Sequence, residues 1–460
     1  MILELYKMGR LFGTDGARGV AVTELTCGTV MQIGRAAAAV LCRKSGKKAK
    51  VLIGKDTRIS SDIMEAALTA GLLSVGADVV SLGVVPTPAV AYLVGELRAD
   101  AGIMISASHN SMEFNGIKLF AGNGYKLSDD VEEEIEALVL DTPHELIAMQ
   151  KSGADVGRLT HETDAIDLYV KHVLSTGERE INGLTIAVDC ANGSASATAE
   201  KLFADIGSKV FLLSCEPDGV NINDNCGSTH LEQLIDFVRE RKCDLGIAFD
   251  GDADRCLAVD GDGNIVDGDK LIAIFSKDMK ERGALKADTA VVTVMTNLGF
   301  SFFAKDNGIK VNTTKVGDRY IIEQMLAEGF NMGGEQSGHI IFHDYATTGD
   351  GELTAIQLLS VMKRTGKSLA ELASVMERYP QVMINVKIAQ KYKEQWKNIP
   401  EIEDIISEKD KALDGRGRIL VRESGTEPLI RVMIEGKDFN EINDMAVEIA
   451  DKVRACCHAE

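Results

Sequence analysis

Residues 245–255 read Leu-Gly-Ile-Ala-Phe-Asp-Gly-Asp-Ala-Asp-Arg, an apolar run followed at once by three alternating aspartates. The run 245–249 predicts a buried strand, and the aspartates then lie at its carboxyl end, where open α/β sheets bind their ligands. Asp250, Asp252 and Asp254 can converge on one hard cation, because magnesium prefers oxygen ligands. A solvated acidic turn is the alternative. An EF-hand loop is excluded, because the glycine and the glutamate that it requires at positions six and twelve are absent.

The bulk composition is that of an ordinary globular protein, with 45% hydrophobic and 26% charged residues. A length of 460 residues predicts about three or four domains. No stretch approaches the ~18 unbroken apolar residues of a membrane helix, and the first residues lack the layout of a signal peptide. The nine cysteines contain no C-x-x-C pair, which favours reduced thiols and a cytoplasmic location.

The formal net charge of −20 argues against a sequence-blind nucleic-acid binder, which needs a basic face. An acidic protein that handles an anionic substrate must gather positive charge locally, so basic residues in glycine-rich or serine-rich loops are of interest. Common nucleotide motifs are absent. Residues 366–368 read Gly-Lys-Ser, but the earlier glycine of a phosphate loop is replaced by Val361, and no G-x-G-x-x-G follows an expected strand.

Apolar β-branched runs alternate with helical patterns in three rounds, and the pattern changes after Pro380. This predicts three similar α/β domains followed by a smaller carboxy-terminal α+β domain. The expected strands are 51–54, 78–82, 101–105, 185–189, 209–213, 245–249, 290–294, 310–313, 339–342, 381–388, 418–421 and 429–435, with helices over 63–75 and 440–455. The predicted domains are residues 1–155, 156–256, 257–375 and 376–460.

A second loop, Ser106-Ala-Ser-His-Asn110, follows the expected strand 101–105. Its small residues allow a tight turn that presents a hydroxyl, which becomes a nucleophile only when a base or a metal activates it. A phosphorylated Ser108 would carry a charge of about −1.5 to −2 and would be a natural partner for a cation held by the three aspartates. A polar turn that caps the next helix is the alternative, and His109 taken alone is more often a structural residue.

Lys118 lies between apolar neighbours ten residues after this serine. Partial desolvation can lower the pKa of a lysine enough for it to accept a proton. A surface lysine that extends its charge into water is the alternative.

Two further loops combine glycine with polar side chains. Glu335 and Ser337, within Gly333–His339, alternate and therefore face one side of an extended chain, where they suit the hydroxyls of a sugar. Residues 422–428 read Arg-Glu-Ser-Gly-Thr-Glu-Pro, with Arg431 shortly after, a combination that can clamp a phosphate. Plain turns are the alternatives in both places. Arg18 occupies another glycine-rich stretch near the start.

These loops, in this order and over essentially the whole chain, resemble the α-D-phosphohexomutase superfamily. The resemblance implies four domains around a central cleft, each contributing one loop, with Ser108 carried as phosphoserine. The residues that we expect to be catalytic are Ser108, His109, Lys118, Arg18 and His339. It implies metal ligation by Ser108, Asp250, Asp252 and Asp254. It implies substrate contacts from Arg255, Glu335, Ser337, Arg422, Ser424, Gly425, Thr426 and Arg431.

Within the superfamily, the sequence motifs are most similar to those of the phosphoglucosamine mutase family of bacteria. The shared motifs are Phe12–Gly16, Val85–Ala89, Lys315–Tyr320, Gly334–His339 and Thr347–Gly351. Two positions depart from the pattern. Ser111 replaces the proline that usually follows the Ser-His-Asn loop, and Glu423 puts an acid where the family carries a basic or neutral residue, which is expected to weaken phosphate binding.

The resemblance implies an isomerase that converts glucosamine 6-phosphate into glucosamine 1-phosphate for amino-sugar nucleotide and cell-wall precursor synthesis. It implies one Mg²⁺ per chain and a hexosamine 1,6-bisphosphate as intermediate and activator. Lys118 is expected as a base near the serine, His339 as an acid or base at the sugar, and Arg18 as a phosphate ligand. The last domain is expected to move on the segment near Pro380. The chain is expected to be a monomer or homodimer that binds neither nucleic acid nor membrane.

Three alternatives stay open at this point. A phosphomannomutase/phosphoglucomutase would use the same chemistry on another sugar. A metal-dependent serine phosphatase would pass the phosphoryl group from Ser108 to water. A sugar-phosphate sensor would keep the fold without catalysis, although such a protein has no need for a nucleophile.

Overall fold

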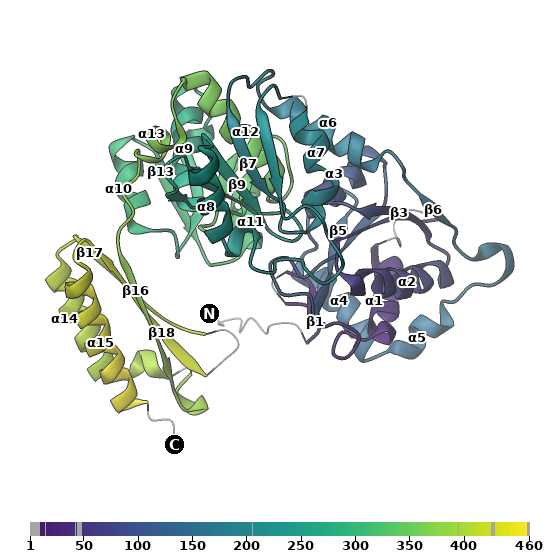
Figure 1. The fold of residues 1–460 in the computed structure, drawn as a ribbon. Coiled ribbons are helices and arrows are strands. Elements are labelled where there is room, and N and C mark those ends of the chain that lie inside the picture. Colours follow the sequence, from purple (N-terminus) through teal and green to yellow (C-terminus); the bar gives the residue numbers. More distant parts are fainter. Residues whose placement is uncertain are drawn as a thin grey trace. The chain divides into compact units, whose positions relative to one another are not determined.

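The computed structural model describes residues 10–13, 15–41, 43, 48–204, 206–393, 395–424 and 428–457 (Figure 1). These residues group into two compact units. Unit 1 comprises the described residues of Met1–Met295 together with Ile309–Val375, and unit 2 comprises Thr296–Gly308 together with the described residues of Met376–Glu460.

Unit 1 begins with a six-stranded sheet whose strand order is β1-β5-β4-β2-β3-β6. Its central strands β2, β3 and β4 are parallel, and β5 and β1 extend it in antiparallel pairing. The strands are β1 (Ala17–Val20), β2 (Lys50–Lys55), β3 (Asp78–Val84), β4 (Ala101–Ile105), β5 (Phe114–Ala121) and β6 (Leu159–His161). The helices are α1 (Cys27–Leu41), α2 (Ile59–Ser74), α3 (Thr87–Glu96), α4 (Asp129–Leu140) and α5 (Pro143–Ala148).

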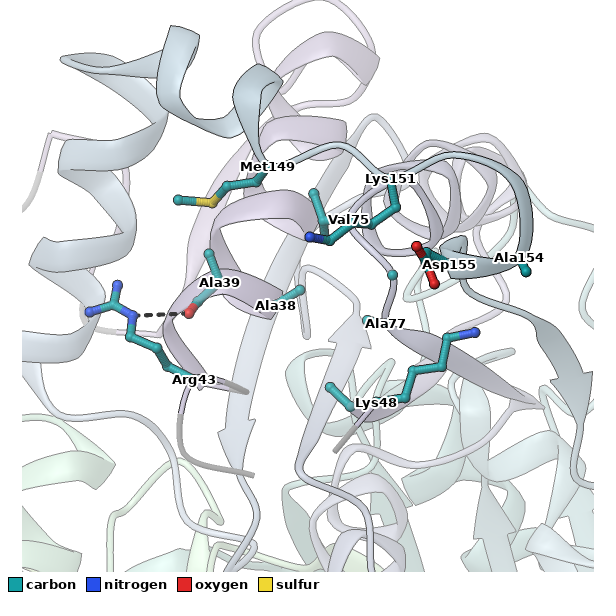
Figure 2. Close-up of a pocket in the computed structure, with 12 residues that line it drawn as sticks. Ala38, Ala39, Arg43, Lys48, Val75, Ala77, Met149, Lys151, Ala154 and Asp155 are labelled. Atoms are coloured by element: carbon teal, nitrogen blue, oxygen red, sulfur yellow. Dashed lines mark hydrogen bonds between the residues drawn. The ribbon is translucent and has the colours of Figure 1, made fainter. Parts of the chain in front are cut away.

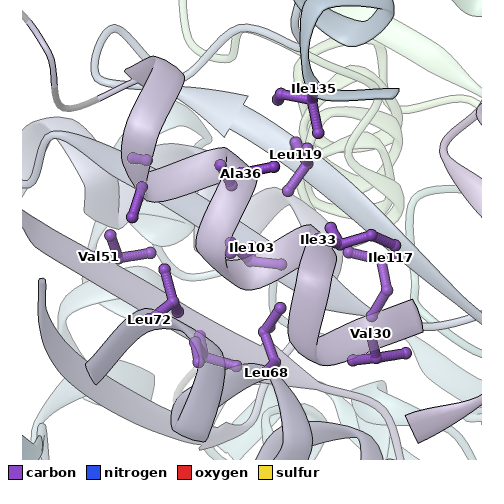
Figure 3. Close-up of a cluster of buried hydrophobic side chains, with 14 of the residues drawn as sticks. Val30, Ile33, Ala36, Val51, Leu68, Leu72, Ile103, Ile117, Leu119 and Ile135 are labelled. Atoms are coloured by element: carbon purple, nitrogen blue, oxygen red, sulfur yellow. The ribbon is translucent and has the colours of Figure 1, made fainter. Parts of the chain in front are cut away.

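The core of this region lies between the sheet and helices α1, α2 and α4 (Figure 3). The apolar positions of the helices and of one sheet face meet there, and each fully buried aliphatic side chain contributes about 1.5–3 kcal/mol. Members of the cluster include Val30, Ile33, Val51, Leu68, Leu72, Ile103, Ile117 and Ile135. Helix α3 packs closely on β2 and β4, because a Cβ on Gly54 or Gly102 would lie 2.5 Å from a valine of α3. The loops that follow these strands are therefore supported by a packed layer on either side.

The second sheet of unit 1 has the order β11-β10-β9-β7-β8. Strands β8, β7 and β9 are parallel, and β10 turns back on β9 as an antiparallel neighbour. The strands are β7 (Thr185–Asp189), β8 (Lys209–Leu213), β9 (Leu245–Phe249), β10 (Cys256–Asp260) and β11 (Ile265–Val266). The helices of this segment are α6 (Ala165–Thr176), α7 (Ala199–Ala204) and α8 (Glu232–Arg241).

The third sheet of unit 1 has the order β13-β12-β14-β15, parallel except for the last pair. The strands are β12 (Thr289–Thr293), β13 (Lys310–Thr314), β14 (Met332–Gly334) and β15 (Ile340–Phe342). The helices are α9 (Gly268–Glu281), α11 (Asp318–Glu328), α12 (Gly351–Thr365) and α13 (Leu369–Ala373).

Unit 2 is an antiparallel sheet of order β16-β18-β17 with its own apolar core. The strands are β16 (Gln381–Lys387), β17 (Gly417–Glu423) and β18 (Leu429–Gly436), and the helices are α10 (Leu298–Asp306), α14 (Pro400–Leu413) and α15 (Phe439–Cys456). Segment 296–308 joins this unit through buried polar contacts. Asn297 Nδ2 donates to Glu435 Oε1 at 3.1 Å and to Tyr379 O at 3.0 Å.

The predicted α/β class is confirmed, with an α/β sheet in each of three successive segments and a smaller antiparallel α+β unit. The boundary expected after residue 155 separates β6 from the first sheet, to which it belongs. The boundary expected after residue 256 separates most of β10, and β11, from the second sheet. The first two sheets therefore extend further along the chain than the pattern indicated. Among the described residues, no helix combines the length and the apolar character needed to cross a lipid bilayer.

Candidate active site

The loop that carries Ser108 follows β4, and the structure joins it directly to the three-aspartate loop. Ser108 is 1% exposed and adopts a left-handed backbone conformation with φ 53°. Its N–H donates to Ser106 Oγ at 2.9 Å, and its Oγ donates to Asp250 Oδ2 at 2.6 Å. The expected serine and the expected metal ligands therefore occupy one buried site.

Two residues far away in sequence hold the carbonyl groups of this loop. Arg58, fully buried at the start of α2 and paired with Asp56, donates to the carbonyl oxygens of Ser108, Asn110 and Ser111. Asn223 Nδ2 donates to the Ser108 oxygen at 2.9 Å and to the Asn110 oxygen at 3.0 Å. A non-glycine residue in the left-handed region is costly and persists where its surroundings fix it. The charge-assisted bonds of Arg58 supply that constraint.

The aspartate loop has the properties of a metal site. One oxygen atom from each of Asp250, Asp252 and Asp254 lies within 4.8 Å of the others, and all three residues are buried. Asp252 Oδ1 and Asp254 Oδ1 are buried and accept no hydrogen bond from the described residues. Burial, with Asp254 and Asp252 nearby, raises the pKa of Asp250 to about 8. Three crowded carboxylates with free oxygens fit a hard divalent cation, which would supply the missing charge.

The Thr347–Gly351 motif contacts the backbone of the aspartate loop. The N–H of Gly351 donates to Ala253 O at 2.9 Å, and a Cβ on Gly351 would lie 2.4 Å from Arg255 O. Only glycine permits this approach of the α12 amino terminus. Asp350 caps the helix and accepts a hydrogen bond from Tyr169 at 2.8 Å.

Lys118, on β5, is buried and surrounded by carboxylates. Its Nζ lies 2.7 Å from Asp252 Oδ2, 3.1 Å from Asp254 Oδ2 and 3.1 Å from Asp15 Oδ2. Burial lowers the pKa of Lys118, but the three carboxylates outweigh it and hold the pKa well above its usual range. The lowered pKa that desolvation alone predicts for Lys118 is therefore wrong. The sequence pattern could not show that three carboxylates surround this amine. A neutral Lys118 requires that a cation offset these carboxylates.

The sugar-type loop between β14 and β15 meets the aspartate loop at His339. The His339 Nε2 atom accepts the N–H of Gly349 at 3.0 Å, and its Nδ1 lies 3.7 Å from Asp254 Oδ1. Burial lowers the pKa of His339, but Asp254 and Asp318 raise it more strongly. Glu335 Oε1 accepts the N–H of Gly317 at 3.0 Å. Ser337 Oγ is buried and has no hydrogen-bond partner among the described residues, so it can bond to a ligand.

Three other predicted residues line the same region. Arg18 lies on β1 and forms an ion pair with Asp15, whereas Arg255 follows the aspartates directly. The Nε atoms of both arginines are buried without a hydrogen-bond partner among the described residues. The ring of His109 lies with Nδ1 3.4 Å from Ser108 Oγ, and burial with Arg255 and Arg18 nearby lowers its pKa to about 4. His109 is therefore neutral at pH 7.

Sequence reasoning missed a group of residues that bridge the loops. Lys126 forms ion pairs with Asp15 and Asp318, and Asp318 Oδ2 lies 3.4 Å from His339 Nε2. Asp15 belongs to the Phe12–Gly16 motif and Asp318 to the Lys315–Tyr320 motif. These motifs therefore marked both aspartates, but the sequence did not indicate what they contact. Lys126 carried no signal in the sequence.

The phosphate-type loop lies in unit 2. Arg422 and Arg431 are directly opposite each other on β17 and β18, and burial together with Arg431 lowers the pKa of Arg422. Two like charges at paired positions are unfavourable unless an anion joins them. Arg431 Nε is buried and unpartnered among the described residues. Ser424 is 1% exposed, whereas Gly425 and Thr426 lie outside the described residues.

Glu423 has its own partners in unit 2. Its carboxylate accepts from Trp396 Nε1 at 3.2 Å and from Lys397 Nζ at 3.1 Å. Successive residues of a strand point to opposite faces of the sheet, so Glu423 faces away from Arg422. The structure gives no reason to expect the weakened phosphate binding that the sequence suggested.

A cavity of about 630 Å³ lies at the carboxyl ends of α1 and α2 (Figure 2). Two of the cations that line it are engaged by other groups. Arg43 Nε donates to Ala39 O at 3.2 Å, and Lys48 Nζ donates to Val156 O at 2.7 Å. None of the predicted site residues lines this cavity, so it is separate from the candidate active site.

Family models match the chain in four consecutive segments. They are described as phosphoglucomutase/phosphomannomutase α/β/α domain I (residues 9–145), domain II (167–263), domain III (267–379) and the C-terminal domain (383–452). A phosphoglucomutase/phosphomannomutase family protein from Burkholderia thailandensis has the same fold, with a TM-score of 0.79, 22% identity and 98% of both chains covered. An Aspergillus fumigatus N-acetylphosphoglucosamine mutase, solved with GlcNAc-6P and magnesium, matches with a TM-score of 0.67 and 17% identity, over 98% of this chain and 96% of that one. The four family models, together with the shared fold, thus define a phosphohexomutase-type enzyme.

Relatives with high identity narrow the class. A phosphoglucosamine mutase of Clostridium perfringens strain SM101 is 52% identical over 451 residues, which cover 98% of this chain and all of that protein. A phosphoglucosamine mutase of Caldanaerobacter subterraneus is 51% identical over 446 residues, covering 97% and 99% of the two chains. The chain belongs to the phosphoglucosamine mutase family, and the resemblance stated from its motifs is confirmed.

Proposed function

We propose that the protein interconverts glucosamine 6-phosphate and glucosamine 1-phosphate through phospho-Ser108 and glucosamine 1,6-bisphosphate. The observation that carries the proposal is the 2.6 Å bond from Ser108 Oγ to Asp250, inside a cluster of carboxylates with free oxygens. A buried serine bonded to a metal-type carboxylate suits phosphoryl transfer and has no use in a plain turn. Family membership supports the sugar.

In the first step the phosphoryl group moves from Ser108 Oγ to the free hydroxyl of the sugar phosphate. The P–O bond to the serine breaks, a P–O bond to the sugar forms, and the hydroxyl proton passes to a base, for which Lys118 and His339 are the candidates. The bisphosphate then turns over and returns its other phosphate to Ser108, so the phosphate count does not change. Arg18 and Arg255 have buried Nε atoms ready for a phosphate near the serine.

Asp250, Asp252, Asp254 and the phosphorylated Ser108 would hold one Mg²⁺, which would neutralise charge on the transferring group when bound. The fixed positions of these side chains do the rest, because phosphoryl transfer relies mainly on placement and electrostatics. Arg422, Arg431 and Ser424 of unit 2, with Gly425 and Thr426, are proposed to bind the phosphate that is not reacting. Glu335 and Ser337 are proposed to contact the sugar hydroxyls in both orientations of the substrate.

The test follows glucosamine 6-phosphate with Mg²⁺ and a trace of the bisphosphate by phosphorus NMR. The wild-type protein should form glucosamine 1-phosphate faster than it converts glucose or mannose phosphates. Ser108→Ala should abolish the conversion, whereas Ser111→Ala, which removes an exposed hydroxyl of the same segment, should keep it. Release of inorganic phosphate alone would replace the proposal by a serine phosphatase, and equal turnover of the three sugars would remove the assigned sugar.

A further inference from the structure

The Val85–Ala89 motif has no role in the mechanism above, yet it contacts the aspartate loop. Its sequence is Val-Pro-Thr-Pro-Ala, and Thr87 is the first residue of α3, after Pro86 at the N-cap. Thr87 is fully buried. Proline is well tolerated in the first turn of a helix because those N–H groups have no partner within the helix. The flanking prolines restrict the backbone and fix the direction of the Thr87 side chain.

Both hydrogen-bond donors of Thr87 bond to one aspartate. The Thr87 N–H donates to Asp252 O at 2.9 Å, and the Thr87 hydroxyl donates to Asp252 Oδ2 at 2.5 Å. The same Oδ2 accepts from Lys118 Nζ at 2.7 Å. Asp252 Oδ1 is buried without any hydrogen bond from the described residues. One carboxylate oxygen is therefore held by two donors, and the other is left for a ligand of a different kind.

We propose that Thr87 is a positioning residue that orients Asp252 as a metal ligand. The inference rests on the metal site of the proposed function. The last torsion of an aspartate is broad, so an unrestrained carboxylate would present either oxygen at varying angles. The Thr87 hydroxyl fixes this torsion, and the bond from its N–H fixes the backbone of the same residue. Partners that orient a metal ligand in this way typically change metal affinity or activity about 10–100-fold when they are removed.

The contact also links two sheets of unit 1. Thr87 begins the helix that covers β2 and β4, whereas Asp252 follows β9 in the second sheet. The amino end of α3 carries partial positive charge and therefore favours the acidic loop. Asp252 is thus oriented by a residue from outside its own sheet.

The test compares the Mg²⁺ affinity of the full-length protein with that of three variants by isothermal titration calorimetry. Thr87→Val has nearly the same shape and keeps the N–H but removes the hydroxyl, so the dissociation constant should rise about 10–100-fold. Thr87→Ser restores the hydroxyl and should stay within about threefold of wild type. Thr289→Val is the matched control, because it removes a buried threonine hydroxyl that donates to Ala287 O at 3.0 Å. It should leave the affinity unchanged.

The outcomes separate this inference from the proposed function. A Thr87→Val protein that binds Mg²⁺ as tightly as wild type overturns the inference alone. A wild-type protein that binds no Mg²⁺ overturns the metal site and the inference with it. If Thr87→Val does not fold, as judged by circular dichroism, Thr87→Ala against Thr87→Ser provides the same comparison of a site without and with the hydroxyl.

Discussion

Replacing Gly251 with alanine should slow the enzyme by separating the serine loop from the aspartate loop. A Cβ on Gly251 would lie 2.6 Å from Ser108 O and 2.8 Å from Asn223 Nδ2, whereas ordinary contacts begin at 3.4 Å. The serine backbone must therefore retreat by about 0.8 Å, and a misplacement of ~1 Å can cost about 10²-fold in rate. We expect kcat to fall about 10–100-fold with little change in KM, because the groups proposed to bind the sugar phosphate are not displaced.

The assay measures initial rates of glucosamine 1-phosphate formation for purified Gly251→Ala and for a control variant. Gly95→Ala is the control, since no atom lies within 4 Å of its added Cβ and it lies in an exposed part of α3. This control should keep full activity and gain about 0.5–1 kcal/mol of stability, because alanine is the better helix former. A Gly251→Ala protein with kcat within twofold of wild type would refute the close approach of the two loops.

Three more changes have defined outcomes. Arg58→Lys keeps the charge but loses the planar group that binds three carbonyls, so kcat in the same assay should fall at least tenfold. Ser108→Ala serves as the inactive reference. An unchanged kcat would show that Asn223 suffices to hold the carbonyl groups of the serine loop. Burial raises the pKa of Glu352 to about 8 from its ordinary 4.5. As pH rises, the unfolded chain therefore loses this proton before the folded protein does, and the stability of the wild type falls between pH 4.5 and about 8. Glu352→Gln has no such proton, so its thermal stability relative to wild type should increase as pH rises from 5 to 8. The difference in unfolding free energy should be at most about 1.4 kcal/mol per unit of pKa shift. Arg422→Gln removes the proposed charge-assisted phosphate contact, which would contribute about 1.5–3 kcal/mol, so KM should rise about 10–100-fold without loss of thermal stability. An unchanged KM would remove the arginine pair from substrate binding.

The sequence predicted the buried parallel strands well and the edges of the sheets poorly. The ranges 101–105, 185–189 and 245–249 coincide with β4, β7 and β9, because strands covered on both faces are continuous apolar runs. The range 209–213 coincides with β8, a partly exposed edge strand that the sequence predicted as well. Strand β10 begins at the domain boundary that the pattern predicts after residue 256. Its pairing with β9 depends on the aspartate loop 250–255, which turns the chain back, and no periodicity within five residues reveals an antiparallel partner.

The candidate site shows a similar division. The aspartates, the serine and the arginines of the loops could be predicted from the sequence, because each short loop combines several reactive or charged residues. Thr87, Arg58 and Asn223 act through bonds to segments far away in sequence, and no local pattern reveals those partners. The pKa of Lys118 could not be predicted either, since its direction depends on three carboxylates contributed by two distant segments.

The grouping of the chain into two units has an evolutionary consequence. The reactive serine, the aspartate loop and the sugar-type loop belong to unit 1, whereas the opposed arginines Arg422 and Arg431 belong to unit 2 with a hydrophobic core of its own. Under the proposed function, bond breaking and the retention of a distant phosphate are assigned to residues of separate modules. Mutations in unit 2 can adjust the length or charge of an accepted substrate while the reactive centre stays intact, so new specificities can arise without rebuilding the chemistry.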